Sequence, residues 1–232
     1  MKYGMFYFGN ENFKIPPILL INGAKKEIRF KNLNIHEFTE ICLNDTYHLK
    51  YLKRKIKTVR SIVDIGANQG LFAIAARQYF PGAEISCYEP NNQLEESLSF
   101  NARQLNLKVY YEAVMKNDCT VDLHFTESDL ATTTKESING KVPAVSLQTI
   151  IERTGNVDIL KMDCEGAEWE LLENKVAWKE IKSLTLEYHL WAKPGVTIEK
   201  LFQLLDDIKF KIIHHKILSS DQGIILAMNL QN

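Results

Sequence analysis

The chain has 232 residues, a length that fits one large domain or one domain with an appendage. Hydrophobic residues make up 45% and charged residues 25%, which is enough apolar material for a sizeable core, so disorder, collagen and a disulfide-dependent miniprotein are excluded. The 28 lysines and arginines nearly balance the 29 aspartates and glutamates, so no global field of either sign recruits nucleic acid or an anionic membrane.

The cysteines and the apolar runs indicate the compartment. Cys42, Cys87, Cys119 and Cys164 lie far apart and form no C-x-x-C pair, which argues against a structural zinc site or a disulfide framework and suits a reducing environment. No apolar run approaches the ~18 residues of a membrane span, and the N-terminus lacks the long apolar centre of a signal peptide. We therefore expect a soluble cytoplasmic protein.

The first sixty residues are predicted to form an appendage. Ile15–Ile21 and Glu27–Phe30 are expected to pair as a hairpin through the turn signal Asn22-Gly23. Asn34, followed three residues later by Glu37, resembles a capping box that opens a short helix ending at Leu43. The basic stretch at 50–60 is most simply a solvated helix face.

From Ser61 onward, short apolar strands alternate with amphipathic helices. The predicted strands are Ser61–Ile65, Glu84–Glu89, Lys108–Val114, Thr120–Phe125, Val142–Val145, Val157–Met162, Leu184–Tyr188, Phe210–His214 and Gly223–Met228. The predicted helices are Gly70–Tyr79, Leu94–Leu105 with Asn92 as its cap, Leu147–Arg153, Ala167–Asn174 and one after Thr197. This alternation predicts an α/β fold whose mostly parallel sheet is covered on both faces, with the last two strands antiparallel at one edge.

The glycine turn after the first of these strands is a candidate ligand site, because ligands bind beyond the carboxyl ends of parallel strands. It reads V-D-I-G-A-N-Q-G over residues 63–70. Gly66 can supply a tight turn, and Gly70 lets the helix start close to a ligand. Asn68 stands where a dinucleotide fingerprint would have a glycine, and Asp64 suits an ammonium group better than a pyrophosphate. An ordinary strand-to-helix turn is the structural alternative.

The next strand ends in Y-E-P-N at 88–91. Glu89 follows Asp64 at about the spacing at which an acid binds ribose hydroxyls in nucleotide-binding folds. A surface acid at a strand end is the simpler interpretation of Glu89 alone. The two segments in this order favour a nucleoside ligand.

A third segment, L-K-M-D-C-E-G-A-E at 160–168, ends a buried strand and opens a helix. Glu165 and Glu168 fall in the first helical turn, where acids commonly stabilise the helix dipole. Asp163 stands on the strand end itself and has no such explanation. His189, with Glu187 two residues before it, ends the following strand and can face the same cleft.

These segments resemble the FkbM-type methyltransferases, within the Rossmann-like S-adenosylmethionine-dependent class. The resemblance rests on the three motifs above and on L-E-Y-H at 186–189, and it covers roughly residues 60–190. It implies a class I methyltransferase fold over residues 61–232, with a mostly parallel seven-stranded sheet and an antiparallel C-terminal edge hairpin. The appendage, residues 1–60, matches no motif of the family and is a candidate cap over the substrate. It also implies methyl transfer, usually to a hydroxyl of a sugar, polysaccharide or polyketide-like natural product, and in some members to peptide amide nitrogens.

Carried over residue by residue, the resemblance assigns each part of S-adenosyl-L-methionine to a strand end. It implies that Glu89, with Pro90 beside it, binds the ribose, that Ala113 and Val114 flank the adenine, and that Asp163 lines the methyl-transfer site. The residues that it assigns to the methionine part are Asp64, Gly66, Asn68 and Gly70.

Methyl transfer from a sulfonium is an in-line displacement, so alignment supplies most of the catalysis. A base that removes the proton of an acceptor hydroxyl would add roughly 10²–10⁴-fold. Asp163 is the first candidate for this base and His189, whose ordinary pKa lies nearest neutrality, is the second, with Glu165 and Glu187 as further candidates. The same four residues have metal-binding side chains but no recognisable ligand spacing, so no metal is expected.

Three features outside the motifs are candidates for contact with a glycan or small-molecule acceptor. Thr126–Lys141 is predicted to be a long loop, which is uncommon unless it serves as a lid or a binding loop. Trp169 and Trp191 can stack on a sugar ring, although core packing is the simpler role for each. The basic stretch at 50–60 would suit an acidic acceptor, such as a phosphorylated or uronic sugar.

Other functions remain as alternatives at this stage. A nucleic-acid methyltransferase would use residues 50–60 to hold phosphates, but Asp163-Cys164-Glu165-Gly166 replaces the Asn-Pro-Pro-aromatic motif of base-amino methyltransferases, so no nucleic acid is expected. An NAD-dependent oxidoreductase would need the three-glycine fingerprint. The protein could also be a catalytically silent binding module, but the intact set of Asp64, Gly66, Gly70 and Glu89 argues against a loss of cofactor binding. The sequence leaves the acceptor and the oligomeric state open.

Overall fold

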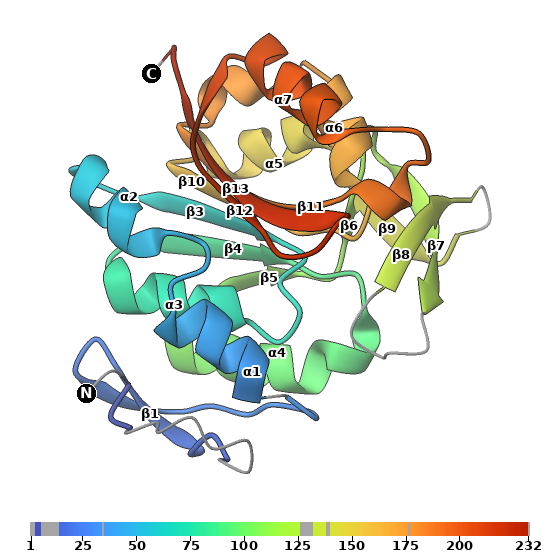
Figure 1. Cartoon of the computed structure of the whole chain (residues 1–232). Coiled ribbons are helices and arrows are strands. Elements are labelled where there is room, and N and C mark those ends of the chain that lie inside the picture. Colours follow the sequence, from blue (N-terminus) through green and yellow to red (C-terminus); the bar gives the residue numbers. More distant parts are fainter. Residues whose placement is uncertain are drawn as a thin grey trace.

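A seven-stranded sheet with the strand order β12-β13-β11-β10-β3-β4-β5 forms the centre of the computed structural model (Figure 1), which describes residues 3–5, 14–33, 35–125, 132–137, 140–175 and 177–231. Five strands run parallel: β3 (Ser61–Ile65), β4 (Glu84–Tyr88), β5 (Lys108–Tyr110), β10 (Ile159–Met162) and β11 (Ser183–His189). β13 (Gln222–Asn229) lies antiparallel between β11 and β12 (Phe210–Ile217). The predicted fold class and its antiparallel C-terminal hairpin are confirmed.

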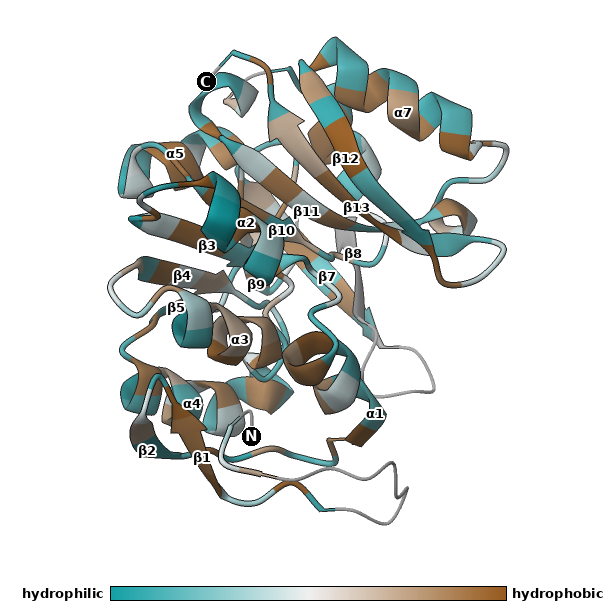
Figure 2. Cartoon of the chain, turned by 60° about the vertical axis from the view of Figure 1, so that its left-hand side comes forward, coloured by the Kyte–Doolittle hydropathy of each residue, from teal (hydrophilic) through white to brown (hydrophobic). Residues whose placement is uncertain are grey.

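Helices cover both faces of this sheet, which explains why its central strands read as nearly continuous apolar runs. α3 (Leu71–Tyr79) and α4 (Glu95–Leu105) lie below the sheet in Figure 1. α5 (Leu147–Thr154), α6 (Glu168–Glu173) and α7 (Ile198–Asp207) lie above it. Apolar and polar residues alternate along α7 in Figure 2, and the leucines of its apolar stripe are buried. None of the helices in the described part of the chain is long and apolar enough to cross a membrane.

The N-terminal segment packs into the core below the sheet. It contains β1 (Ile18–Ile21), β2 (Ala24–Glu27), α1 (Ile35–Phe38), a π-helical turn (Thr39–Leu43) and α2 (Leu49–Lys55). Leu19, Phe38 and Leu52 are fully buried in the same apolar cluster as Ile74 of α3. The hairpin and α1 lie beside α3 and α4 in both views (Figures 1 and 2). This segment therefore contributes to the core on which the central sheet rests.

Two predictions in the first half of the chain were wrong, and a third falls on a residue outside the described ranges. The second strand of the hairpin begins at Ala24 instead of Glu27, because Asn22 and Gly23 both adopt positive φ and close the turn at once. The side chain of Asn91, not Asn92, accepts the capping hydrogen bond from the Gln93 amide at 3.0 Å. Asn34, half of the predicted capping box, lies outside the described residues.

A second, four-stranded sheet with the order β6-β9-β7-β8 corrects two further predictions. The expected strand 108–114 is split between two sheets, since β5 ends at Tyr110 and β6 (Ala113–Val114) pairs with β9 (Val142–Val145). The expected loop 126–141 contains a strand, β8 (Thr132–Glu136), which pairs antiparallel with β7 (Cys119–Phe125). Residues 126–131 and 138–139 lie outside the described residues. That this segment meets the acceptor stays a prediction.

Because the N-terminal segment shares a core with α3, it should unfold together with the sheet. Phe38→Ala should lower the free energy of unfolding by about 3–5 kcal/mol, since Phe38 has 0% of its surface exposed. Ile18→Ala is the matched control, because Ile18 is 55% exposed and its truncation should cost no more than about 0.5 kcal/mol. Denaturant unfolding followed by tryptophan fluorescence and circular dichroism should give one transition in both variants. Separate transitions would show that residues 1–60 form an independent unit.

Candidate active site

Two cavities lie at the carboxyl ends of the central strands and share part of one wall. The first cavity lies around the ends of β3 and β4 and is closed by Leu94, Ala113 and Val114. The second cavity lies between the end of β11 and the N-terminal segment, and Tyr47 and Glu187 line it. Four residues line both cavities: Gly66, Asn68, Asp163 and Glu165. The two cavities are therefore adjacent and are bordered by the same four residues.

Most of the predicted site residues are brought together here. Those that line the first cavity are Gly66, Asn68, Glu89, Pro90, Ala113, Val114, Asp163 and Glu165. Three others line neither cavity. Asp64 is buried beneath the glycine turn, Gly70 begins α3 behind it, and His189 lies beneath Glu165.

Gly66 makes the close approach of two strand-end loops possible. It adopts a φ of 72°, and a Cβ atom added there would meet the carbonyl oxygen of Asp163 at 1.7 Å. The amides of Gly66 and Ala67 both donate to the carbonyl oxygen of Tyr88, at 3.0 and 3.1 Å. The glycine turn is thus fixed to β4 on one side and pressed against the end of β10 on the other.

Glu89 is a buried carboxylate held in one orientation. One oxygen accepts the Asn68 amide and the other accepts the Asn91 amide, each at 2.8 Å. Burial raises the pKa of Glu89 to about 7, against the opposing effect of the two amide donors. The side chain therefore presents a fixed acceptor to the first cavity and loses its charge as the pH falls below about 7.

A buried lysine, which the sequence analysis did not single out, joins β3 to β10. The Lys161 ammonium lies 3.3 Å from the Asp64 carboxylate and 3.4 Å from that of Asp163. It also donates to the carbonyl oxygens of Ile65, at 3.1 Å, and Gly66, at 2.6 Å. Burial alone would lower the pKa of Lys161, but the carboxylates of Asp64 and Asp163 raise it above its ordinary value. Asp64 therefore pairs with an ammonium group, as its position suggested, but this ammonium is that of Lys161 and not that of a ligand.

Tyr47 is a second site residue that the sequence did not reveal. Its hydroxyl donates to Glu187 at 2.8 Å and lies 3.4 Å from the carboxylate of Asp163. Its ring packs edge-on against Phe72 of α3, with centroids 5.5 Å apart. The loop before α2 is held by Asp45, whose two carboxylate oxygens accept the first two amides of that helix at 2.9 Å each. The polar residues in N-D-T-Y-H at 44–48 indicate an ordered turn, but no local sequence pattern predicts that the Tyr47 side chain points into the site.

His189 is buried and paired. Its Nδ1 atom lies 3.1 Å from a carboxylate oxygen of Glu168, and its own amide donates to the same oxygen at 2.9 Å. Burial alone would lower the pKa of His189, but the hydrogen bond and charge of Glu168 raise it to about 9. At neutral pH the ring is a cation whose Nε2 atom lies 3.6 Å from Glu165. This suits the positioning of Glu165 better than proton abstraction.

Asp163, Glu187 and His189 offer three metal-ligating atoms within 4.8 Å of one another. The charges around them oppose a divalent ion, because the Lys161 ammonium already pairs with Asp163 and a protonated imidazole has no free lone pair for a metal.

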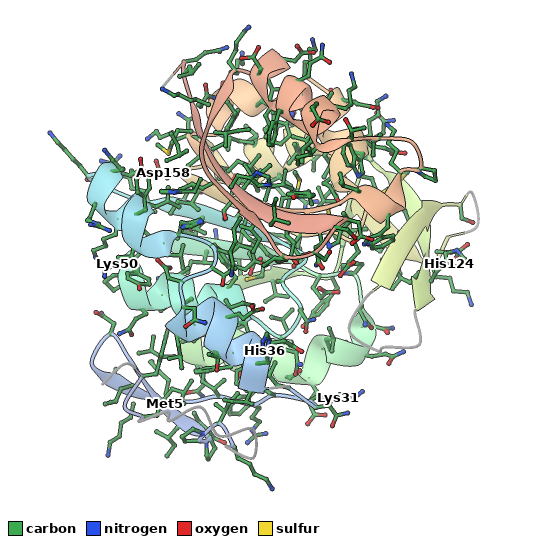
Figure 3. All side chains as sticks on the ribbon, viewed as in Figure 1. Met5, Lys31, His36, Lys50, His124 and Asp158 are labelled. Atoms are coloured by element: carbon green, nitrogen blue, oxygen red, sulfur yellow. The ribbon has the colours of Figure 1, made fainter. Side chains whose placement is uncertain are left out.

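The tryptophans and the basic stretch are placed as follows. Trp169 is buried, and its indole donates to the carbonyl oxygen of His189 at 3.0 Å, so it packs in the core. Trp191 is 47% exposed and its ring meets that of His189 edge-on, with centroids 5.5 Å apart. Lys50 of α2 lies on the left-hand side of the molecule in Figure 3, and the described basic residues of 50–60 line neither cavity.

A family model described as "Methyltransferase FkbM domain" matches residues 64–213, which is more than half of the chain. The chain belongs to this family. The protein is therefore an S-adenosylmethionine-dependent methyltransferase, and the match begins at Asp64, within the glycine-turn motif. No curated protein matches the sequence.

Several solved structures are similar to this chain. Precorrin-6y C5,15-methyltransferase from Geobacter metallireducens is 14% identical, with a TM-score of 0.47 over 78% of this chain and 87% of that one. Aeropyrum pernix fibrillarin with bound S-adenosyl-L-methionine is 13% identical, with a TM-score of 0.49 over 73% of this chain and 66% of that one. The N-terminal domain of EvdMO1 with SAH bound is 12% identical, with a TM-score of 0.49 over 87% and 89%. This chain spans 43% of the longer EvdMO1 structure.

Because Gly66 lies so close to the backbone of Asp163, a methyl group added at residue 66 should strongly destabilise the fold. Gly66→Ala should lower the free energy of unfolding by about 2 kcal/mol or more, because the new Cβ is disfavoured at positive φ and meets a backbone oxygen. Gly82→Ala is the control, since nothing lies within 4 Å of a Cβ at that turn. Denaturant unfolding measures both effects, and equal stability of the two variants would contradict the close approach.

Proposed function

We propose that this methyltransferase methylates a hydroxyl group of a sugar, polysaccharide or natural product, with the cofactor in the first cavity and the acceptor in the second. The observation that carries the proposal is the wall shared by the two cavities at Gly66, Asn68, Asp163 and Glu165. In-line displacement requires the acceptor oxygen, the methyl carbon and the sulfur to be aligned, and a shared wall between two cavities permits this.

The residues of the first cavity fit S-adenosyl-L-methionine, which supplies an electrophilic methyl group on a sulfonium. The fixed carboxylate of Glu89 retains lone pairs for the ribose hydroxyls beyond the two amides that it accepts. Ala113 and Val114, with Pro90 opposite, provide apolar walls for the adenine. The turn at Gly66 and Asn68, which continues to Gly70, would hold the methionine part. Asp64 would act indirectly, through Lys161.

Asp163 is proposed to line the methyl-transfer site, because it borders both cavities while Lys161 fixes its carboxylate. Glu165 borders the same passage and is held from behind by His189. A carboxylate that lines the second cavity would take the proton of the acceptor hydroxyl as the new bond forms. The proposed proton transfer requires no divalent metal ion.

The charges of the second cavity support an acceptor without a phosphate or carboxylate. Five acids line it, namely Glu37, Glu40, Asp163, Glu165 and Glu187. Lys161 is the single lysine or arginine among its described lining residues, and it is already paired. This arrangement repels a nucleic acid or a uronic sugar and suits a neutral or amine-bearing hydroxyl compound. Because Glu37, Glu40 and Tyr47 belong to the N-terminal segment, we propose that residues 1–60 cap the acceptor.

Cofactor binding can be tested by thermal unfolding. S-adenosylhomocysteine at ~100-fold excess over Kd should stabilise the protein by about 2.7 kcal/mol and raise Tm by roughly 5–10 °C, whereas NAD should not. The shift should diminish as the pH falls below about 7, because Glu89 then becomes neutral. Glu89→Gln should give a small shift that does not vary with pH. A shift with NAD alone would contradict the assignment of the first cavity.

Asp163→Ala should separate binding from turnover. The affinity for S-adenosylhomocysteine should stay within a few-fold of the wild-type value, while turnover falls by roughly 100-fold or more, since Asp163 borders the transfer path. Asp206→Ala, an exposed residue of α7, is the control. S-adenosylhomocysteine release in the presence of D-glucose, D-galactose, D-glucosamine and D-glucuronate is the assay, and D-glucuronate should be the poorest acceptor. Unchanged turnover would remove Asp163 from the mechanism.

A further inference from the structure

The carboxylate of Glu187 differs from Asp163 and Glu165, the two acids of the shared wall, in its position and in its contacts. It stands near the end of β11 and lines the second cavity but not the first. One oxygen accepts the Tyr47 hydroxyl at 2.8 Å and the other accepts the Gln222 side-chain amide at 2.6 Å. Each oxygen keeps a second lone pair, so the group is oriented without being saturated.

We propose that Glu187 is the general base that takes the proton of the acceptor hydroxyl, and that Tyr47 is the positioning residue that orients it. This inference rests on the proposed O-methylation. In this proposal, the proton of the acceptor hydroxyl passes to an acid that lines the second cavity, where the acceptor is proposed to bind.

The other candidates are less suited to this role because each lies beside a cation. Asp163 lies 3.4 Å from the Lys161 ammonium, and Glu165 lies 3.6 Å from His189. Within the described ranges, no ion pair of Glu187 occurs at 4 Å or less, and its two contacts are neutral donors. A carboxylate held by neutral donors retains more affinity for a proton than one paired with an ammonium.

The surroundings of Glu187 adjust its proton affinity to neutral pH. Burial and then the charge of Asp163 raise the pKa of Glu187 to about 7, while the Tyr47 hydroxyl, His189 and Lys161 oppose this rise. Glu37, Glu40 and Glu165 line the same cavity. The carboxylate is therefore charged above about pH 7, where it can accept a proton, and neutral below it.

The proposed step balances in atoms and charge. The acceptor oxygen forms a bond to the methyl carbon as the carbon–sulfur bond breaks, and the sulfur keeps that electron pair as a neutral thioether. The hydroxyl proton passes to Glu187, which later releases it to water. The products are the methyl ether, S-adenosylhomocysteine and a proton.

Both partners of Glu187 come from outside the segment that matches the family. The match covers residues 64–213, whereas Tyr47 precedes it and Gln222 follows it. Gln222 is placed by strand pairing, since it lies opposite His189 in the register of β11 and β13. The orientation of the proposed base thus depends on the N-terminal segment and the C-terminal hairpin of this chain.

A carboxyl titration tests the inference without an acceptor. In protein labelled with ¹³C-glutamate and saturated with S-adenosylhomocysteine, the resonance that disappears in Glu187→Gln should titrate with a midpoint of about 7. Tyr47→Phe should raise this midpoint, because the lost hydrogen bond stabilises the charged form. Tyr111→Phe, which loses a 2.6 Å contact between its hydroxyl and Ser99 away from the site, should not. A midpoint near the ordinary value of 4.5 would overturn the proposal.

Turnover with the sugar panel tests the role in catalysis. Glu187→Gln should lower kcat by about 100-fold or more while the thermal shift with S-adenosylhomocysteine is retained. Tyr47→Phe should move the acidic limb of the kcat–pH profile to higher pH, so that activity recovers in alkaline solution. Glu84→Gln, at the amino end of β4, is the control for a lost surface carboxylate.

The outcomes separate this inference from the proposed function. Turnover within a few-fold of wild type in Glu187→Gln overturns the assignment of the base and leaves O-methylation standing. Transfer to none of the four sugars contradicts a monosaccharide acceptor and leaves the larger acceptors of the proposed class, and the titration midpoint then decides for or against Glu187. Methylation of the glucosamine nitrogen would contradict O-methylation, whereas a loss of that activity in Glu187→Gln would still support its role as the base.

Discussion

The buried ammonium of Lys161 is the interaction on which the site depends. A charge without water must be compensated, and here two carboxylates and two carbonyl oxygens surround it. These partners belong to the ends of β3 and β10, so the pairing fixes the glycine turn and Asp163 relative to each other. A lysine in an otherwise apolar strand is compatible with a stable fold here because these partners compensate its buried charge.

The second cavity is completed by parts of the chain outside the segment that matches the family. The N-terminal segment contributes Tyr47 to its lining, and the C-terminal hairpin contributes Ile224 to the lining and Gln222 as a hydrogen-bond partner of Glu187. A core common to a family can hold the cofactor while the flanking segments choose and orient the acceptor. In our proposal, this division lets the flanking segments set the acceptor without a change in the sheet.

Burial and pairing give the titratable groups of the site distinct protonation states. The pKa of Glu89 and that of Glu187 are each raised to about 7, mainly by burial, and that of His189 is raised to about 9 by Glu168. At neutral pH the histidine is therefore a fixed cation, whereas the two glutamates lie near their midpoints. Carboxyl groups thus have two roles here: Asp163 forms an ion pair with Lys161, and Glu187, in our proposal, accepts a proton.

The sequence by itself determined the α/β class, the order of the main strands and helices, and the strand-end segments at Gly66, Glu89 and Asp163. These follow from hydrophobic periodicity and from the rule that ligands bind at the carboxyl ends of parallel strands, which depend on local order along the chain. Only the tertiary structure decided that Lys161 forms an ion pair with Asp64 and that the Tyr47 hydroxyl donates a hydrogen bond to Glu187. It also decided that Glu168 raises the pKa of His189. Each of these contacts joins residues distant in sequence or on different elements, and no local pattern specifies where such side chains meet.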